Sequence, residues 1–259
     1  MARALTPDLV PAARRLAHRF LRTQAPTMWA EIMAGDAAFR VPDEIAHLDP
    51  AAQARWLAHQ EARRLAQARL FYLEEPATDT AVTAANGLQS RPFLLGRSMP
   101  PAEYGLMVWI RDGSATARGA DIIACHWQVR DDGVQVGWWI DFAGNTRTKM
   151  TAAGYDQAEA DAVIEEYGLL SHHREALLPY GAFTVDGSAD PLMTDRVYAL
   201  AQTTVTSWVI LSDNQTTTRL APAPLGPIAG LEPLPGADDS VTVALRAPDV
   251  EAAATSHPR

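Results

Sequence analysis

Apolar positions in the first third of the chain recur with the spacing of a helix. The segment TPDLVPAARRLAHRFLRTQ places its leucines and its phenylalanine on one side, which predicts an amphipathic helix. A longer pattern, DPAAQARWLAHQEARRLAQARLFYLEE, predicts another helix in which Asp49 is the N-cap and Pro50 occupies the first position. Pro76 ends that pattern, so we predict a helical region over residues 1–75.

Alternation of apolar and polar residues replaces the helical spacing further along the chain, which is typical of strands. Strands are predicted near residues 103–111, 121–129, 134–142 and 240–246. The RDDG connection between the second and third of these strands is far too short for a parallel crossover. We therefore expect an antiparallel sheet built around one hairpin.

The hairpin CHWQVRDDGVQVGWWID sorts its side chains onto two different faces. A two-residue turn at Asp132-Gly133 places Asp131 opposite Val134 and Trp127 opposite Trp138. In this register every paired residue of one face is apolar, and a shift by one residue would destroy that agreement. The apolar face comprises Ile123, Cys125, Trp127, Val129, Val136, Trp138, Ile140 and Phe142. We expect it to lie in the core.

The other face of the hairpin carries polar and aromatic residues. His126 lies opposite Trp139, and Asp141 lies on the diagonal from His126, about 7 Å away between backbones. A carboxylate at that distance can orient an imidazole as a base, although an ordinary cross-strand contact is the simpler interpretation. Trp139 and Trp109 form an aromatic platform in one interpretation and are buried beneath the amino-terminal helices in the other. We predict a second face that is free for a ligand or partner, with a helix laid over it as the alternative.

The remainder of the chain predicts two further helices. GNTRTKMTAAG is interpreted as a loop, and YDQAEADAVIEEYGLL as a short acidic helix that ends near Gly168. DPLMTDRVYALAQTTVTSWVILSDNQ predicts a long helix near residues 190–213, with Trp208 on its apolar stripe. We predict an α+β fold in one compact unit, with a helical region over residues 1–75, a core with an antiparallel sheet over 76–250 and a flexible tail over 251–259.

The order of several segments resembles that of a group of bacterial proteins. These segments are LFYLEEP, the aromatic hairpin, the tryptophan-bearing helix and the terminal VTVALR strand. In this order the chain resembles uncharacterised proteins of high-GC bacteria and of their phages and mobile elements, over residues 70–247. The resemblance implies neither an activity nor any site residue.

Charge is distributed unevenly along the chain. Residues 1–73 hold 10 Arg against 7 Asp or Glu, a balance of +3, and residues 74–259 hold 12 Arg or Lys against 24 Asp or Glu, a balance of -12. The resulting net charge of -9 argues against a general nucleic-acid binder, because an acidic surface repels phosphates. Such a surface instead favours a protein partner or self-association.

Composition narrows the class of protein further. Hydrophobic residues make up 47% of the chain and charged residues 20%, as in ordinary globular proteins. The single cysteine excludes an intrachain disulfide and a thiolate zinc cluster. Neither an apolar run of about 18 residues nor a signal-peptide core is present, so we expect no membrane association and a cytoplasmic location.

The sequence lacks the common catalytic motifs. It contains no phosphate-binding or dinucleotide-binding glycine loop, no Gly-x-Ser-x-Gly elbow and no His-Glu-x-x-His helix. Cys125 and His126 cannot form a local catalytic dyad, because neighbours on a strand point to opposite faces. We therefore interpret Cys125 as an inert buried thiol and leave open whether the protein is an enzyme.

The segment SHHRE is the one candidate for a metal site. His172, His173 and Glu175, together with Glu165 or Glu166, include residue types that bind zinc. Adjacent histidines in a loop rarely reach the same ion, so surface residues are the simpler interpretation. We accordingly predict no metal ligand and no cofactor.

Three functional hypotheses follow. The leading one is a non-enzymatic interaction or regulatory protein, encoded on a phage or mobile element, that binds a host or self protein through an acidic surface. The first alternative is a small hydrolase or metal-dependent enzyme with a site around His126 and Asp141. The second is a DNA-associated protein that uses the amino-terminal arginines, for which a solvated polar face is the simpler interpretation.

Overall fold

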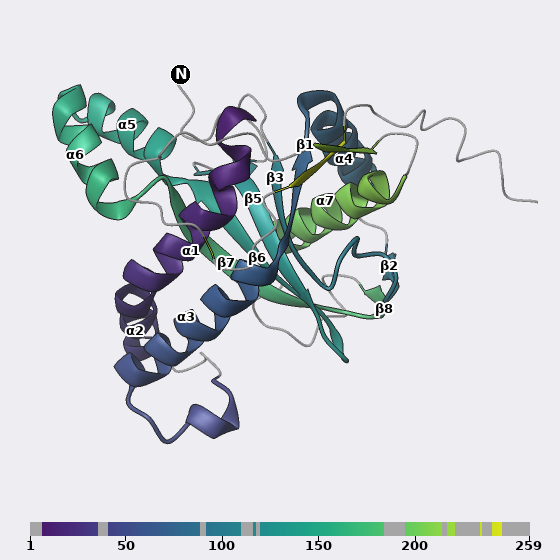
Figure 1. Ribbon diagram of the computed structural model, residues 1–259, viewed down its shortest axis with the longest axis horizontal. Coiled ribbons are helices and arrows are strands. Elements are labelled where there is room, and N and C mark those ends of the chain that lie inside the picture. The colour runs from purple at the N-terminus through teal and green to yellow at the C-terminus, as the bar shows by residue number, and fades with distance from the viewer. Residues whose placement is uncertain are drawn as a thin grey trace, which may run out of the picture.

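A central β-sheet carries helices on both of its faces in the computed structural model of the chain (Figure 1). The structure describes residues 7–35, 41–88, 92–109, 116–117, 120–183, 195–213, 217–220, 234 and 240–244. The α+β class predicted from the sequence is confirmed. The predicted tail over 251–259 lies outside the described residues.

The amino-terminal region is helical as predicted up to residue 67. It comprises the 3-10 helix η1 (Pro7–Ala12), α1 (Ala13–Thr23), α2 (Ala25–Gly35), the 3-10 helix η2 (Asp43–Ile45) and α3 (Pro50–Gln67). Asp49 caps α3, since its side chain accepts a hydrogen bond from the backbone N–H of Ala52 at 2.7 Å. The prediction that this helix continues to Glu75 is wrong, because the RLFYL segment is a strand buried on both faces.

The main sheet is mixed and not purely antiparallel. Its strands run in the order β7-β6-β5-β3-β1-β10-β9, with β4 attached to β5, and β2 pairs separately with β8. The central strand β1 is parallel to both β3 and β10, whereas the other adjacent pairs are antiparallel. The strands are β1 (Arg69–Leu73), β2 (Phe93–Leu95), β3 (Tyr104–Trp109), β4 (Thr116–Ala117), β5 (Ala120–Val129), β6 (Gly133–Asp141), β7 (Leu170–Pro179), β8 (Gly181–Phe183), β9 (Thr217–Leu220) and β10 (Val241–Ala244).

The β5–β6 hairpin has the predicted faces but not the predicted register. Its turn lies at Asp131 and Asp132, where the N–H of Arg130 donates to the carbonyl of Gly133 at 2.8 Å. From Ala124 to Val129 every partner on β6 is therefore displaced by two positions, so that Trp127 lies opposite Val136. An even displacement keeps each side chain on its face, which is why the division into faces survives the error.

Glycines explain why this register fits. A Cβ at Gly137 would lie 2.2 Å from Cε1 of His126, and a Cβ at Gly105 would lie 2.1 Å from Cζ2 of Trp127. The two large rings thus lie over neighbouring positions that have no side chain. The predicted register placed Trp139 opposite His126, where no such space exists.

Irregularities in strand pairing occur at two places, and the first reverses a predicted side-chain orientation. The register of β5 against β6 shifts between Ile122 and Ala124, so Ile122 lies on the face predicted for Ile123. The register of β6 against β7 shifts between Trp138 and Trp139, which lie opposite Arg174 and His172. Such bulges insert one extra residue into a strand and cannot be read from alternation alone.

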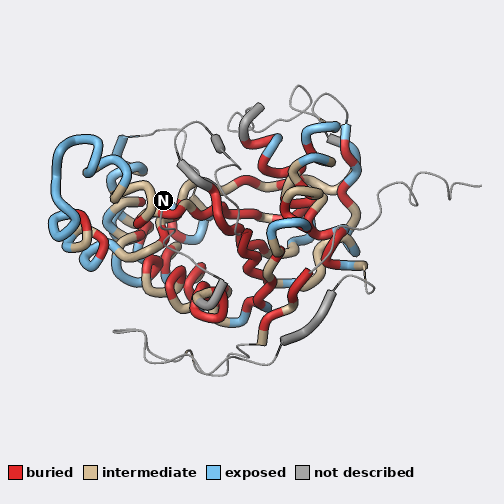
Figure 2. Tube along the Cα trace, turned by 90° about the horizontal axis from the view of Figure 1, so that it is seen from above, coloured by how far each residue is buried: buried red, intermediate tan, exposed pale blue. Residues whose placement is uncertain are grey.

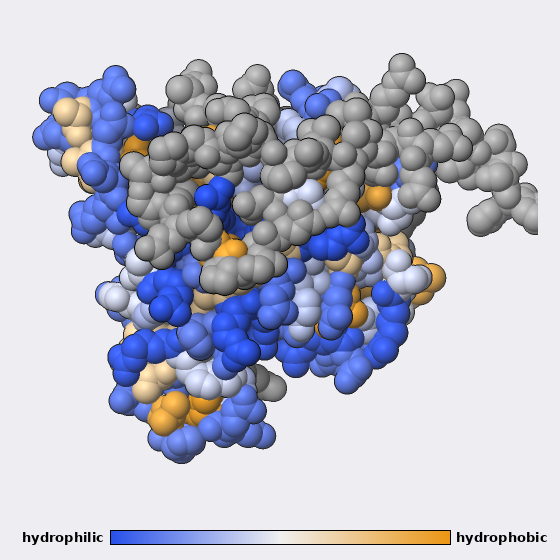
Figure 3. Space-filling model, in the orientation of Figure 1, coloured by the Kyte–Doolittle hydropathy of each residue, from blue (hydrophilic) through white to orange (hydrophobic). Residues whose placement is uncertain are grey.

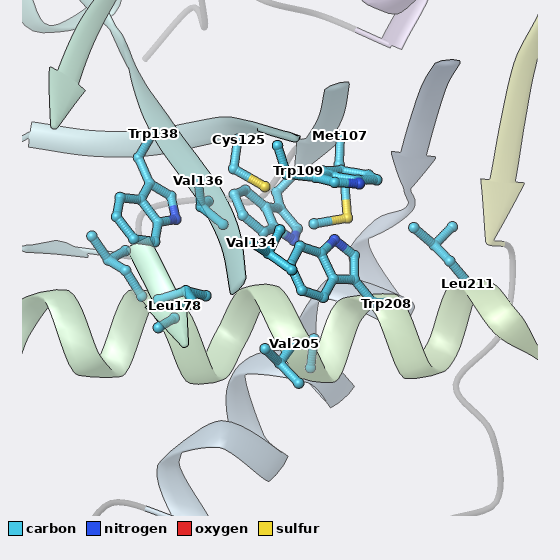
Figure 4. Packing of buried hydrophobic residues seen from close by; sticks show 14 of the residues in the cluster. Met107, Trp109, Cys125, Val134, Val136, Trp138, Leu178, Val205, Trp208 and Leu211 are labelled. Atoms are coloured by element: carbon cyan, nitrogen blue, oxygen red, sulfur yellow. The ribbon is translucent and has the colours of Figure 1, made fainter. Parts of the chain in front are cut away.

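Helices α4 (Glu75–Gly87) and α7 (Asp195–Ser212) cover the apolar face of the sheet. Figure 4 shows the side chains of α7 interleaved with those of the strands, including Trp208, Trp138 and Cys125. The indole N–H groups of Trp109 and Trp138 donate to the hydroxyls of Ser207 and Thr204 of α7. The helix lies within the predicted range, and residues 190–194 lie outside the described part of the chain.

Helices α1, α2 and α3 cover the opposite face of the sheet (Figure 1). The tube in Figure 2 is red through the interior where the strands meet the helices. The prediction that this second face is free for a ligand is therefore wrong: His126 is 5% exposed and Trp139 is fully buried. The burial of Trp139 beneath amino-terminal helices agrees with the alternative interpretation.

The segments after the hairpin differ in part from the sequence prediction. GNTRTKMTAAG, predicted as a loop, belongs mostly to α5 (Phe142–Ala152), and the acidic segment forms α6 (Gln157–Tyr167) as predicted. SHHRE lies in strand β7 and is not a surface loop. None of the helices in the described ranges is long and apolar enough to span a membrane.

Candidate functional site

Four ionisable side chains meet between the sheet and α3. We call Glu61, His126, His172 and Glu175 the His–Glu cluster. His126 lies opposite Gly137, and Gly137 lies opposite Glu175, so these three residues form a row across β5, β6 and β7. The cluster thus lies on the face of the sheet that the amino-terminal helices cover.

Glu61 reaches the sheet because it belongs to the inner stripe of α3. The buried residues Ala54, Ala58, Glu61 and Leu65 follow one another at intervals of four, three and four, which is helical periodicity. Glu61 is 7% exposed, an unusual position for a carboxylate unless it is paired. Periodicity alone places this residue inward, although the sequence analysis did not single it out.

His126 uses both of its ring nitrogens. Nδ1 accepts a hydrogen bond from the indole N–H of Trp139 at 2.8 Å, and Nε2 lies 2.8 Å from Oε1 of Glu61. An indole N–H can only donate, so Nδ1 carries no proton and Nε2 donates to the carboxylate. The carboxylate that orients His126 is therefore Glu61 and not the predicted Asp141.

The charges around His126 act in opposite directions. Burial alone would lower the pKa of His126, but the Glu61 carboxylate outweighs it and raises that pKa above its ordinary value. Trp139 opposes protonation, because an imidazolium would direct two N–H groups at each other. The hydrogen bond from Trp139 fits the neutral ring, whereas the pKa raised by Glu61 favours the imidazolium, so protonation of His126 would break the hydrogen bond from Trp139.

Glu61 is ionised in this environment. Burial alone would raise its pKa, whereas His126 and Arg64 together lower that pKa to about 2. The guanidinium of Arg64 donates from Nη1 to Oε2 of Glu61 at 3.1 Å. Each carboxylate oxygen thus has a partner of its own.

His172 and Glu175 form the second half of the cluster. Nε2 of His172 is buried and has no hydrogen-bond partner among the described residues, although Oε1 of Glu175 lies 3.4 Å away. Burial and the nearby His126 lower the pKa of His172 to about 3, so this ring is neutral. Burial and the Glu61 charge raise the pKa of Glu175, whose Oε2 accepts a hydrogen bond from Gln135 at 2.9 Å.

Aromatic rings close the space around the cluster. The Trp139 indole lies edge-on to the ring of Phe20 from α1, with centroids 5.6 Å apart. Trp29 of α2 packs in the same way against His172, also at 5.6 Å. Apolar groups from the helical layer therefore cover His126 and His172, which strengthens the electrostatic interactions of these two rings, whereas the Glu175 side chain remains 31% exposed.

The predicted site residues separate into different places. Trp109 belongs to the core on the α7 side and Trp139 to the core on the α1–α3 side, so they form no common platform. The Asp141 side chain caps α5 by accepting from the N–H of Gly144 at 2.7 Å. Cys125 is buried on the α7 side, where burial raises the pKa of its thiol, in agreement with an inert role.

The predicted metal group is brought together only in part. His172 and Glu175 lie beside each other, but the histidine that joins them is His126. His173 occupies the pairing irregularity of β7. Glu165 and Glu166 lie exposed at the end of α6, where their backbone carbonyls accept hydrogen bonds from the side chains of Arg19 in α1 and of Gln24, the C-cap of α1.

A helical hairpin is the second candidate feature. Helices α5 and α6 project beyond the edge of the sheet, at the upper left of Figure 1. Every residue from 151 to 159 is exposed, and the buried residues of the hairpin are only Ala143, Ala160 and Ile164. In Figure 3 the surface of this projection is mostly blue and hydrophilic, with tan patches on the hydrophobic side of the scale.

Comparisons with protein-family models, with curated proteins and with solved structures found no match.

Proposed function

We propose that this chain is a non-enzymatic interaction protein and that the α5–α6 hairpin contacts its protein partner. The observation that carries the proposal is the projection of the hairpin together with its continuously exposed tip over residues 151–159. Tyr155 lies within that tip and is 52% exposed. Tyrosine is enriched in protein interfaces because it offers a large, rigid contact area with a polar end.

Charge indicates what kind of partner this hairpin suits. Residues 142–167 hold five carboxylates, on residues 156, 159, 161, 165 and 166, against the basic Arg147 and Lys149, a balance of -3. Arg147 is already engaged, since it donates to Asp161 at 2.9 Å. A partner with a basic surface therefore fits the hairpin, and its association should weaken with salt.

The site chemistry supports a binding role more than the hydrolase alternative. His126 lies beneath helices and both of its nitrogens are engaged within the protein, so it presents no group to a substrate. Asp141 is 5% exposed and caps a helix. The resemblance to proteins of phages and mobile elements makes a host protein or a second copy of the chain the expected partner.

A site-specific crosslinking experiment tests the proposal. A photo-crosslinking amino acid replaces Tyr155 in one variant and Val209 of α7 in the control, where the native side chains are 52% and 54% exposed. We expect a discrete protein adduct at position 155 and none of equal yield at position 209. Equal adducts at both positions, or none at 155, would contradict the proposal.

Charge reversal and hydrodynamics then identify the partner. Glu165→Lys combined with Glu166→Lys should reduce the adduct at position 155 at low salt, because both side chains are exposed on α6. Sedimentation of the purified protein separates the two kinds of partner. A dimer that the double variant disrupts indicates a second copy, and a monomer indicates a different protein.

A further inference from the structure

We propose that the His–Glu cluster is a binding site for a divalent transition-metal ion, with His126, His172 and Glu175 as ligands and Glu61 as the adjacent fourth carboxylate. This inference goes beyond the interaction function and does not depend on it. The site would hold the ion inside the protein, between the sheet and the amino-terminal helices.

The distances between the three ligand atoms are close to those of a metal site. One ligand atom from each of His126, His172 and Glu175 lies within 4.8 Å of the others. A tetrahedral ion with ligand bonds of about 2.0–2.2 Å separates its ligand atoms by about 3.3–3.6 Å. The distance of 3.4 Å between Nε2 of His172 and Oε1 of Glu175 already matches that value. The His126 side chain needs to approach by only about 1 Å, within the reach of small rotamer changes.

An unsatisfied nitrogen is the second and independent observation. Nε2 of His172 is buried and has no hydrogen-bond partner among the described residues. A buried polar atom without a partner is destabilising by about 1–3 kcal/mol, and such atoms are rare in native proteins. A metal ion in the cluster would be coordinated by this nitrogen, which would then no longer lack a partner.

Electrostatics favours a cation at the same place. His172 is buried, and burial favours the uncharged ring, whose nitrogen can coordinate a cation. Glu61 and Glu175 place two carboxylates in the same cluster, and like charges this close repel each other. A divalent cation between them removes the repulsion, whereas Arg64 reaches only Glu61.

The donor set indicates the class of ion. Imidazole nitrogens suit zinc, iron and nickel, and carboxylates are compatible with them, whereas calcium and magnesium prefer all-oxygen sites. With Glu61 in the fourth position, the four side chains of the cluster make a tetrahedral set and leave no coordination position open for a substrate. Zinc is therefore the appropriate probe.

Metal binding has a specific consequence for Trp139. In the metal-free geometry Nδ1 of His126 accepts from Trp139 and the proton lies on Nε2. Coordination through Nε2 requires that proton to move to Nδ1, and the indole N–H of Trp139 then has to turn away. The indole resonance of Trp139 should therefore report occupancy of the site.

Zinc titration of chelator-treated full-length protein tests the inference. We expect one equivalent of Zn²⁺ to bind, and we expect His172→Asn and Glu175→Gln each to weaken binding at least tenfold. His173→Asn is the matched control, since it removes the adjacent histidine, which lies outside the group, and should leave the affinity unchanged. The absence of stoichiometric binding, or an equal loss in the control, would overturn the inference.

A spectroscopic measurement on the unaltered protein keeps the test independent of how the variants fold. In ¹H–¹⁵N spectra of the wild-type chain the Trp139 indole resonance, assigned with Trp139→Phe, should shift as one equivalent of zinc is added. The other six indole signals should move less. Zinc that binds without shifting the Trp139 resonance would place the ion elsewhere and reject this site.

Discussion

The two faces of the sheet bury different kinds of side chain. On the α7 side the interior is apolar, and the indoles of Trp109 and Trp138 give their N–H groups to hydroxyls of the covering helix. On the α1–α3 side the interior contains the His–Glu cluster, with two carboxylates and two imidazoles under aromatic rings. The first face contributes stability through packing, whereas the second carries charge that is tolerable only while it is paired.

The difference is also visible in the polar atoms that lack partners. On the α7 side the neutral indole N–H of Trp208 has no hydrogen-bond partner among the described residues. On the α1–α3 side Nε2 of His172 has none within the same part of the chain, and it lies in the cluster that holds the ionised Glu61. A neutral N–H without a hydrogen bond is destabilising through its desolvation, whereas a buried imidazole nitrogen beside charged groups is a place where a bound cation adds stability.

The largest effect is expected on the apolar face. Trp208→Ala should reduce the free energy of unfolding by roughly 3–5 kcal/mol, because it empties a fully buried site against Trp127. Chemical denaturation measures the loss. Trp208→Phe removes the unsatisfied N–H but keeps most of the ring, so it should lose less than about 1.5 kcal/mol. If both variants lost the same free energy of unfolding, packing of the large ring at position 208 would contribute little to stability.

A smaller effect is expected from the charged face. Glu61→Gln keeps the shape of the side chain but weakens its hydrogen bonds to His126 and Arg64, so unfolding should become easier by about 1.5–3 kcal/mol. Denaturant melts at neutral pH without added metal give the value. Glu44→Gln, in the exposed η2 segment, is the control and should change little. An unchanged stability for Glu61→Gln would mean that the pairing of Glu61 with His126 and Arg64 does not stabilise the folded chain.

The glycines test both faces with the same chemical change. Gly105→Ala introduces a methyl group against Trp127, and Gly137→Ala introduces one against His126. Each should lose about 1–3 kcal/mol through overpacking, measured by thermal or denaturant melts. Only Gly137→Ala should also weaken zinc binding. A loss of zinc affinity in Gly105→Ala would show that the two faces are coupled.

The smallest effect is expected in the loss of stability at acidic pH. The pKa of Glu61 in the folded chain is about 2, below its ordinary value of 4.5, so the folded state binds this proton less readily than the unfolded state. The stabilisation is complete above pH 4.5 and disappears as the pH falls toward 2. Between pH 5 and 3.5 the wild type should lose on the order of 1 kcal/mol more than Glu61→Gln. Parallel pH curves for the two proteins would contradict this assignment.

Sequence reasoning succeeded where alternation and helical spacing are local properties. It placed Trp127 and Trp138 on one face of the hairpin and His126 on the other, because parity along a strand survives an error in register. It also located the α7 helix and the last strand. It failed at β1, because the RLFYL segment directly follows a helical pattern. This segment is a strand because it pairs with β3 and β10, which are distant in the sequence.

The His–Glu cluster was missed for a different reason. Its members come from α3, β5 and β7, and no local spacing brings these segments together. One signal was present: Glu61 shares the inner stripe of its helix with Ala58 and Leu65. A carboxylate on such a stripe predicts a buried partner, and the unexplained histidines of the chain were the available partners. The irregular pairing that turns His172 inward had no local signal.

The parallel pairing of β1 with β10 has a consequence for biosynthesis. β1 leaves the ribosome long before β10, since residue 73 precedes residue 241 by 168 positions. At about 5–20 residues per second, one edge of this central strand waits on the order of 10–30 s for its partner. An unpaired edge rich in Leu and Phe is a template for association with other nascent chains. Translation speed over the 168 codons between the two strands, and chaperone capture during that interval, should therefore influence the yield of folded protein.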